Sequence, residues 1–219
     1  MTQLTSSTQR RGFLGSVAAG MATLAAGRWS LAHAELSAPT LPGDEWVAKI
    51  TGKHKQVFDC VSSNDGFGAA FPVNYIDSAK QATKLSDKDF SAVVVYRHFS
   101  MPLALKDSIW AKYKIGAMLK VNDPKTNAPA TRNIFRDNVP LHPGVTYEQL
   151  MANRGIIIVA CDMALSAFSG MTAANAGVTP EAAKKEWTAN LLPGVSLAPS
   201  GVYAVNRAQE AGCTYCFGG

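Results

Sequence analysis

The residue whose type and position most favour chemistry is Cys161. It directly follows the apolar run from Ile156 to Ala160 and precedes a segment whose apolar residues have helical spacing. A cysteine at the N-terminus of a helix lies at the positive end of the helix dipole, which favours the nucleophilic thiolate. The competing interpretation is a buried, inert cysteine, because free cysteines are among the most buried residues. Position alone does not decide between the two.

Two cationic residues follow a second apolar run. Arg97 and His98 come directly after the β-branched stretch from Ser91 to Tyr96. If this strand is parallel and close to the one before Cys161, both strands end at the same edge of a sheet. An Arg or a protonated His beside a thiol lowers its pKa, and His98 could also act as a general base. Side chains satisfied by backbone or solvent are an equally good interpretation for both.

Four further polar residues are candidates for binding a ligand at this edge. Asn64 and Asp65 follow the first predicted strand, although a plain turn explains them better. Ser100 and Asp162, which lie beside His98 and Cys161 in the sequence, complete the predicted ligand-binding set.

Cys213 and Cys216 have the CxxC spacing of redox motifs. Such motifs need the first cysteine at a helix N-terminus, but this pair lies in a predicted terminal strand. Residues i and i+3 of a strand point to opposite faces, with Cα atoms roughly 10 Å apart, beyond disulfide reach. Thiol–disulfide exchange at this pair is therefore disfavoured. A disulfide from Cys60 or Cys213 to another cysteine stays open.

No motif for a metal or a cofactor stands out. The histidines that follow residue 34 are widely separated, and there is no HExxH, no CxxCH and no glycine-rich phosphate loop. We expect neither a metal nor a cofactor.

Predicted strands and helices alternate along the chain, which predicts an α/β fold. The runs at 91–96 and 156–160 are continuously apolar, as in parallel strands covered on both faces. Shorter strand candidates lie at 55–61, 195–198 and 213–217. Together they indicate a three-layer α/β/α sandwich with a mostly parallel open sheet of about five strands. Residues 100–145 interrupt this rhythm and are predicted to form an inserted lid, arm or oligomer contact.

The first 34 residues have the features of a twin-arginine export signal. Arg10-Arg11 precede Phe-Leu and a Gly/Ala-rich stretch, and Ala32-His33-Ala34 fits a cleavage site. Residues 35–52 then form an N-terminal arm and residues 53–219 the domain. Removal of residues 1–34 lowers the Lys plus Arg count from 21 to 18, against 16 acidic residues. We therefore expect a periplasmic or otherwise exported protein that binds no nucleic acid and does not insert stably into a membrane.

The C-terminal third resembles the DsrE/DsrF-like family, in particular its exported members with twin-arginine leaders. The resemblance rests on the segment IIIVACDMAL at 156–165, on LPGV at 192–195, and on PSGV at 199–202 followed by QEAGCTY at 209–215. It covers residues 146–217 well and 55–98 weakly. It implies an α/β/α subunit that forms homo-oligomers, often trimers or hexamers. In some members the cysteine that matches Cys161 carries sulfur as a persulfide.

Two hypotheses follow. In the first, the protein is a sulfur carrier or sulfurtransferase in which Cys161 accepts sulfane sulfur, assisted by Arg97 or His98. A partner protein would donate the sulfur or receive it. This hypothesis predicts an accessible Cys161 with a lowered pKa, and a buried thiol would contradict it. In the second, the protein is a non-catalytic module that binds a small ligand at the strand ends or assembles oligomers, with residues 100–145 covering the ligand or joining subunits.

Overall fold

The structure is a computed structural model that describes residues 43–137 and 139–219. The predicted export signal at 1–34 and the first part of the predicted arm, residues 35–42, lie outside the described residues. The second part of the arm contains the 3-10 helix η1 (Val47–Lys49) and is not simply extended as predicted. Trp46, Val47 and Ile50 of this segment are buried.

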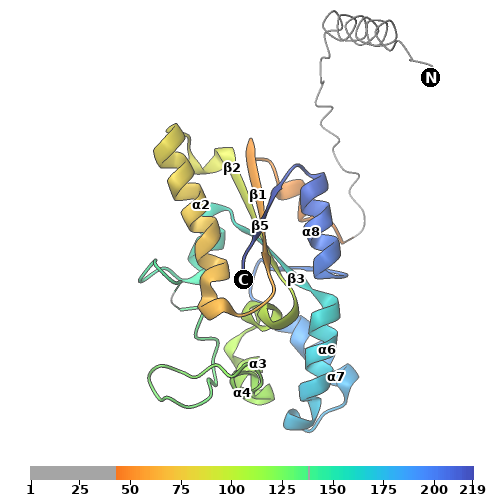
Figure 1. The fold of residues 1–219 in the computed structure, drawn as a ribbon. Coiled ribbons are helices and arrows are strands. Elements are labelled where there is room, and N and C mark those ends of the chain that lie inside the picture. Colours follow the sequence, from red (N-terminus) through yellow and green to blue (C-terminus); the bar gives the residue numbers. More distant parts are fainter. Residues whose placement is uncertain (1–42, 138) are drawn as a thin grey trace, which may run out of the picture. The chain divides into compact units, whose positions relative to one another are not determined.

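A sheet of five parallel strands forms the centre of the molecule (Figure 1), as the sequence predicts. Its strands are β1 (His54–Cys60), β2 (Phe90–Tyr96), β3 (Ile157–Cys161), β4 (Ser196–Ala198) and β5 (Thr214–Phe217). Every residue of β2 and β3 is buried, which explains why these strands are apolar throughout instead of alternating.

The strand order is β4-β3-β2-β1-β5, and it shows where the connections stop adding strands toward one edge of the sheet and return to the other. The first four strands lie side by side in chain order, and β5 returns to pair with β1. The chain leaves β3 into α6 (Asp162–Thr172) but leaves β4 into α8 (Gly201–Glu210), which crosses back over β3, β2 and β1. The carboxyl ends of β3 and β4 therefore form a topological switch point, the usual place for a ligand in an open α/β sheet.

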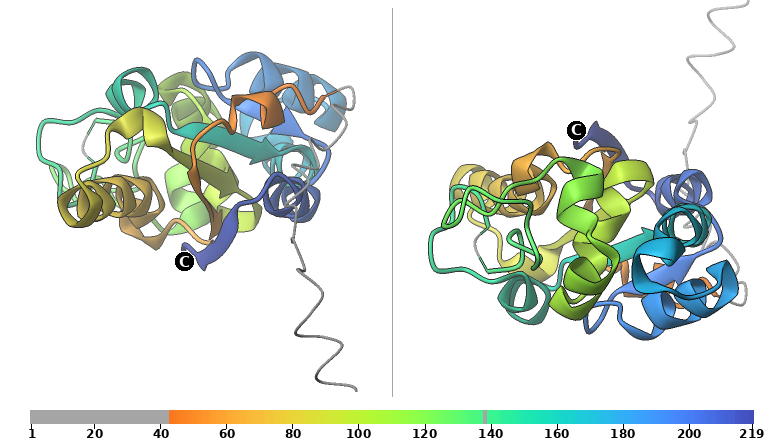
Figure 2. Two further views of the ribbon diagram at one scale, coloured as in Figure 1. Left: turned by 90° about the horizontal axis from the view of Figure 1, so that it is seen from above. Right: turned by 90° about the horizontal axis from the view of Figure 1, so that it is seen from below.

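Helices cover both faces of the sheet, which gives three layers (Figure 2). One face is covered by α2 (Phe67–Thr83) and α5 (Tyr147–Arg154), and Val94 and Tyr96 point into this core. The other face is covered by α8 and η1, and Val93 and Val95 point toward them. The alternation along β2 thus supplies both cores.

Local sequence signals set the helix ends. The Thr146 hydroxyl oxygen accepts a hydrogen bond from the Gln149 backbone amide, and the Gln149 side-chain oxygen accepts one from the Thr146 backbone amide, so a capping box starts α5. Gly155, with φ +62°, ends it. α2 runs without interruption from Phe67 to Thr83, with Pro72 inside it.

The insert at 100–145 packs on its own subunit. It contains the 3-10 helix η4 (His98–Ala104), which starts just before it, together with α3 (Asp107–Tyr113) and α4 (Ile115–Leu119). Trp110 and Tyr113 are fully buried, and the Trp110 indole N–H donates to the carbonyl oxygen of Pro102 over 3.0 Å. The insert is therefore part of the core of this subunit.

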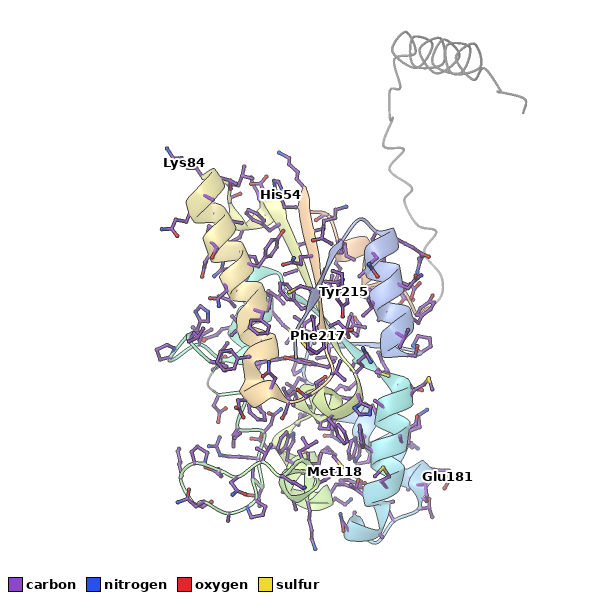
Figure 3. The ribbon with its side chains drawn as sticks, viewed as in Figure 1. His54, Lys84, Met118, Glu181, Tyr215 and Phe217 are labelled. Atoms are coloured by element: carbon purple, nitrogen blue, oxygen red, sulfur yellow. The ribbon has the colours of Figure 1, made fainter. Side chains whose placement is uncertain are left out.

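Helices also lie beyond the carboxyl ends of the strands. Figures 1 and 3 show α3, α4, α6 and α7 (Pro180–Ala189) past this edge, and Met118 and Glu181 lie further from His54 than Phe217 does. The 3-10 helix η5 (Ala173–Ala176) joins α6 to α7 and contacts α3. We call α3, α4, α6, η5 and α7 the capping lobe. Within the described residues, no helix is long and apolar enough to cross a membrane.

Candidate functional site

Cys161 lies where the sequence predicts, at the end of β3 and as the N-cap of α6. Its sulfur accepts a hydrogen bond from the Ala164 amide over 3.3 Å, a contact that stabilises a thiolate. However, the residue is only 5% exposed. The predicted accessible thiol is therefore wrong for this structure, since the capping lobe packs over the strand ends and Cys161 belongs to the same core cluster as Leu165 and Phe168.

Arg97 projects from the end of β2 toward β1. Its Nε and Nη2 groups donate to the two carboxylate oxygens of Asp59 over 2.6 and 2.9 Å, a bidentate pair. The Tyr215 hydroxyl on β5 donates to the same carboxylate over 3.0 Å. The pKa of Arg97 is raised, first by the hydrogen bonds to Asp59 and also by the charges of Asp59, Tyr215 and Cys161 when these are ionised. Tyr96 pairs with Ala160 in the register of β2 and β3, so Arg97 and Cys161 come next at neighbouring strand ends.

The N-terminus of α8 fixes the position of Arg97 from another side. A Cβ atom on Gly201 would lie 2.3 Å from the Cβ of Arg97, so glycine is needed for this close approach. Ser200 caps the helix by accepting a hydrogen bond from the Tyr203 amide over 3.1 Å. Arg97 is thus held between Asp59 and α8 at the switch point.

His98 follows the end of β2, at the edge of the sheet where the sequence analysis expects it. It is exposed, has a left-handed backbone with φ +53°, and contacts the rings of Phe99 and Phe168 at centroid distances of 4.3 and 6.2 Å. Because these aromatic contacts hold the ring, the structure gives no support to His98 as the base that activates Cys161.

Three of the four predicted ligand-binding residues make structural contacts, and the fourth, Asp65, lies in a turn. Asn64 donates from its amide to the carbonyl oxygen of Gly218, and exposed Asp65 adopts a left-handed turn conformation. Buried Ser100 lies within hydrogen-bond distance of the carbonyl oxygens of Cys60 and Arg97, at 2.6 and 2.8 Å. Asp162 forms an ion pair with Lys184 of α7 at 2.9 Å.

All four cysteines are free. Cys213 packs in the core on the α8 face and Cys216 against the core on the α2 face, as expected for positions i and i+3 of an extended segment. Burial raises the pKa of Cys60 to about 12, with the Asp59 charge as the next cause, and burial raises that of Cys213 to about 11. Both thiols are therefore protonated and poorly nucleophilic near neutral pH.

Asp59 and Tyr215 are the residues that the sequence analysis missed. Asp59 is 4% exposed within the otherwise apolar end of β1, and a carboxylate so deeply buried needs a cationic partner. The sequence signal for this pair was Asp59 itself, a single acidic residue inside an apolar strand. Tyr215 had none, because its contact with Asp59 depends on β5 pairing with β1.

No family model matches the chain, and no curated protein matches it. The resemblance to the DsrE/DsrF-like family therefore stays a prediction.

Proposed function

We propose that the protein is a sulfur carrier in which Cys161 accepts sulfane sulfur at a site that is closed in this structure. The observation that carries the proposal is the Cys161 sulfur at the N-terminus of the eleven-residue helix α6, hydrogen-bonded to an amide and next to the strand end that carries Arg97. Both features stabilise a negative charge on sulfur. The resemblance to the DsrE/DsrF-like family adds support from the sequence.

The transfer step needs no outside oxidant. The Cys161 thiolate attacks the sulfane sulfur of a polysulfide, a new S–S bond forms on Cys161, and the S–S bond within the donor breaks. The shortened polysulfide leaves with the electron pair of that bond. With thiosulfate as donor, sulfite is the leaving group. Arg97 stabilises the thiolate and then the persulfide anion, whereas Asp59 and Tyr215 keep Arg97 in place.

A thiol that is 5% exposed cannot meet a protein donor directly, which contradicts the first hypothesis in its open form. The proposal therefore includes an opening movement that exposes Cys161. The capping lobe is the element that must move, because its helix α6 begins at Cys161 and its helices α3 and α7 lie beyond the strand ends (Figure 1). Export to the periplasm and assembly into a trimer or hexamer belong to the same proposal.

A second candidate is a non-catalytic assembly module. The edge strand β5 exposes Tyr215 and Phe217, which are 48% and 62% accessible, together with its unpaired side. Exposed apolar edges of this kind favour association between subunits.

The test is intact mass spectrometry of the folded protein after incubation with polysulfide or thiosulfate. The wild type should gain one or more sulfur atoms, and Cys161→Ser should gain none. Cys216→Ser is the matched control, because Cys216 is the most exposed of the four thiols and should not be required. Modification that is lost with Cys216 and kept without Cys161 would overturn the proposal. If the folded wild type gains no sulfur and resists alkylation at Cys161, the assembly module is the better hypothesis.

A further inference from the structure

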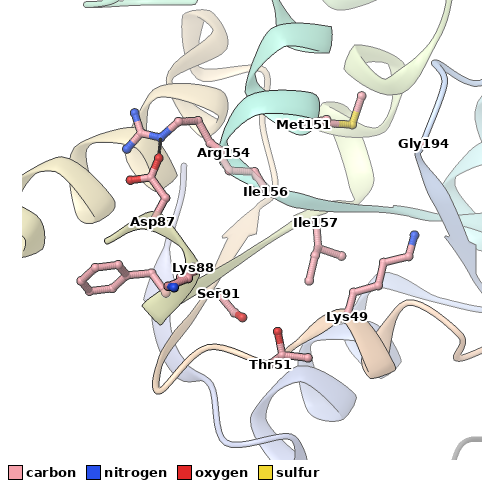
Figure 4. A pocket seen from close by; sticks show the side chains of 12 residues that line it. Lys49, Thr51, Asp87, Lys88, Ser91, Met151, Arg154, Ile156, Ile157 and Gly194 are labelled. Atoms are coloured by element: carbon pink, nitrogen blue, oxygen red, sulfur yellow. Dashed lines mark ion pairs between the residues drawn. The ribbon is translucent and has the colours of Figure 1, made fainter. Parts of the chain in front are cut away.

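A hollow lies at the opposite edge of the sheet from Cys161. Its volume is about 590 Å³, within the range of small-molecule sites. It is lined at the amino ends of β2 and β3 by segments that are far apart in the sequence, among them Lys49, Lys88 and Met151 (Figure 4). Nothing in the proposed sulfur chemistry uses this hollow.

The inner wall of the hollow is apolar. Phe90, Ile156 and Ile157 line it and are each less than a tenth exposed, and the half-buried Met151 extends this surface. An aliphatic or aromatic group placed there would bury apolar area at ~25 cal/mol per Å². The wall therefore suits the apolar body of a ligand.

The rim of the hollow carries excess positive charge. Lys49, Lys88 and Arg154 line it with a single carboxylate, Asp87. Arg154 pairs with Asp87 across 3.0 Å (Figure 4) and with Asp77 across 2.7 Å, and Asp87 also pairs with Lys80. Within the described part of the chain, neither Lys49 nor Lys88 forms an ion pair. Two ammonium groups are thus left on the rim for an anion.

Two hydroxyl groups add directional contacts. Ser91 is buried at the amino end of β2, and its oxygen accepts a hydrogen bond from the Gly52 amide over 2.8 Å. That contact uses a lone pair and leaves the hydroxyl proton for an acceptor in the hollow. The hydroxyl of exposed Thr51 lies beside it (Figure 4). Both groups can donate to an acidic head group.

We propose that this hollow binds a small organic anion, an acid group joined to an apolar body. The acid group lies between Lys49 and Lys88 and accepts from the Ser91 hydroxyl, while the apolar body packs on Phe90, Ile156 and Ile157. The site is independent of Cys161, which ends the same strand β3 at the opposite edge.

The test uses the full chain and the probe 8-anilinonaphthalene-1-sulfonate, an aromatic anion whose fluorescence rises in apolar surroundings. The variant Lys49→Glu/Lys88→Glu should weaken its binding about tenfold, since two attractive charges become repulsive. The matched control is Lys120→Glu/Lys185→Glu, two exposed lysines away from the hollow with the same change in net charge. Octanoate should displace the probe, whereas octanol should not.

Binding is located by the backbone amide signals of Gly155 and Gly194, which line the hollow and should shift on titration with octanoate. The proposal is overturned if both double variants weaken binding equally, because the effect is then one of overall charge. It is also overturned if octanol competes as well as octanoate, or if the shifted amides lie elsewhere.

Discussion

The two edges of the sheet differ in how far helices cover the strand ends. At the carboxyl edge, the capping lobe packs over the strand ends, and Cys161 is buried beside the Asp59–Arg97 pair. At the amino edge, η1, η3 (Asp87–Asp89) and the end of α5 stand apart and leave a hollow of about 590 Å³. The carboxyl edge of an open α/β sheet is the usual ligand site. Here that edge holds the buried Cys161 thiol, and the hollow lies at the other edge.

This difference teaches that chemical groups and open space need not coincide in one fold. The polar network at the carboxyl edge is ordered and closed, with Asp59 using both carboxylate oxygens on Arg97 and Tyr215. The lysines at the amino edge are exposed, and within the described residues neither Lys49 nor Lys88 forms an ion pair. If both proposals hold, one edge performs thiol chemistry after an opening movement, and the other binds an anion without one.

The largest expected effect comes from removing a buried tryptophan at either edge. Trp110 belongs to the capping lobe and Trp46 to the segment beside η1, and both are at most 1% exposed. Replacing either by Ala should lower the free energy of unfolding by about 3–5 kcal/mol, because the loss of burial leaves a cavity. Urea unfolding measures this loss.

The milder pair Trp110→Phe and Trp46→Phe keeps the comparison testable if the Ala variants do not fold. Only Trp110→Phe should speed alkylation of Cys161 by iodoacetamide, because only that change loosens the lobe over the thiol. Equal rates of Cys161 labelling in the two Phe variants would show that the lobe does not control access.

Two glycines provide a second pair of matched changes. A Cβ on Gly201 would lie 2.3 Å from the Arg97 Cβ, and a Cβ on Gly52 would lie 2.4 Å from the Phe90 carbonyl carbon. Each Ala variant should therefore lose about 1–3 kcal/mol of stability through overpacking. Gly201→Ala should also slow the reaction of Cys161 with polysulfide, since it displaces Arg97.

Gly52→Ala should instead weaken the binding of the anionic probe, because Gly52 donates to the Ser91 hydroxyl that lines the hollow. Thermal unfolding, the rate of sulfur uptake and probe affinity are measured on both variants. If each variant impaired both functions to the same extent, the two edges would not be independent.

Local features were predicted well from the sequence. The position of Cys161 before α6 depends only on neighbouring residues, the apolar run before it and the helical spacing of apolar residues after it. The continuously apolar runs of β2 and β3 correctly predicted parallel strands covered on both faces. These runs and the three shorter strand candidates were sufficient to predict the α/β fold with its sheet of five strands.

The surroundings of the site could not be predicted because they depend on contacts between distant segments. To predict the burial of Cys161, one would need to know that the capping lobe packs over the strand ends. The Asp59–Arg97–Tyr215 network requires the order of β2, β1 and β5 in the sheet. The left-handed conformation of His98, which places its ring against Phe168, has no sequence signal comparable to a glycine.

The smallest expected effect concerns an ion pair that ties the capping lobe together. Glu186 of α7 accepts hydrogen bonds from Lys112 and from the Tyr113 hydroxyl of α3, at 2.7 and 2.6 Å to the same oxygen. These contacts hold the pKa of Glu186 below its ordinary value, with Lys112 as the first cause. The stability they contribute is therefore complete above the ordinary pKa of Glu, about 4.3, and is lost as the pH falls through the lowered pKa.

Glu186→Gln should thus cost less than about 1 kcal/mol at pH 7, because the pair is partly exposed, and should flatten the acid side of the stability curve. Glu210→Gln on α8 is the control, since Arg207 and Asn206 likewise lower the pKa of Glu210 outside the lobe. Both variants should flatten the curve of unfolding free energy against pH. At pH 7.5, however, only Glu186→Gln should speed alkylation of Cys161, because only Glu186 joins two helices of the capping lobe. A rise in the Glu210→Gln variant instead would mean that access to the thiol is controlled from the α8 side of the switch point.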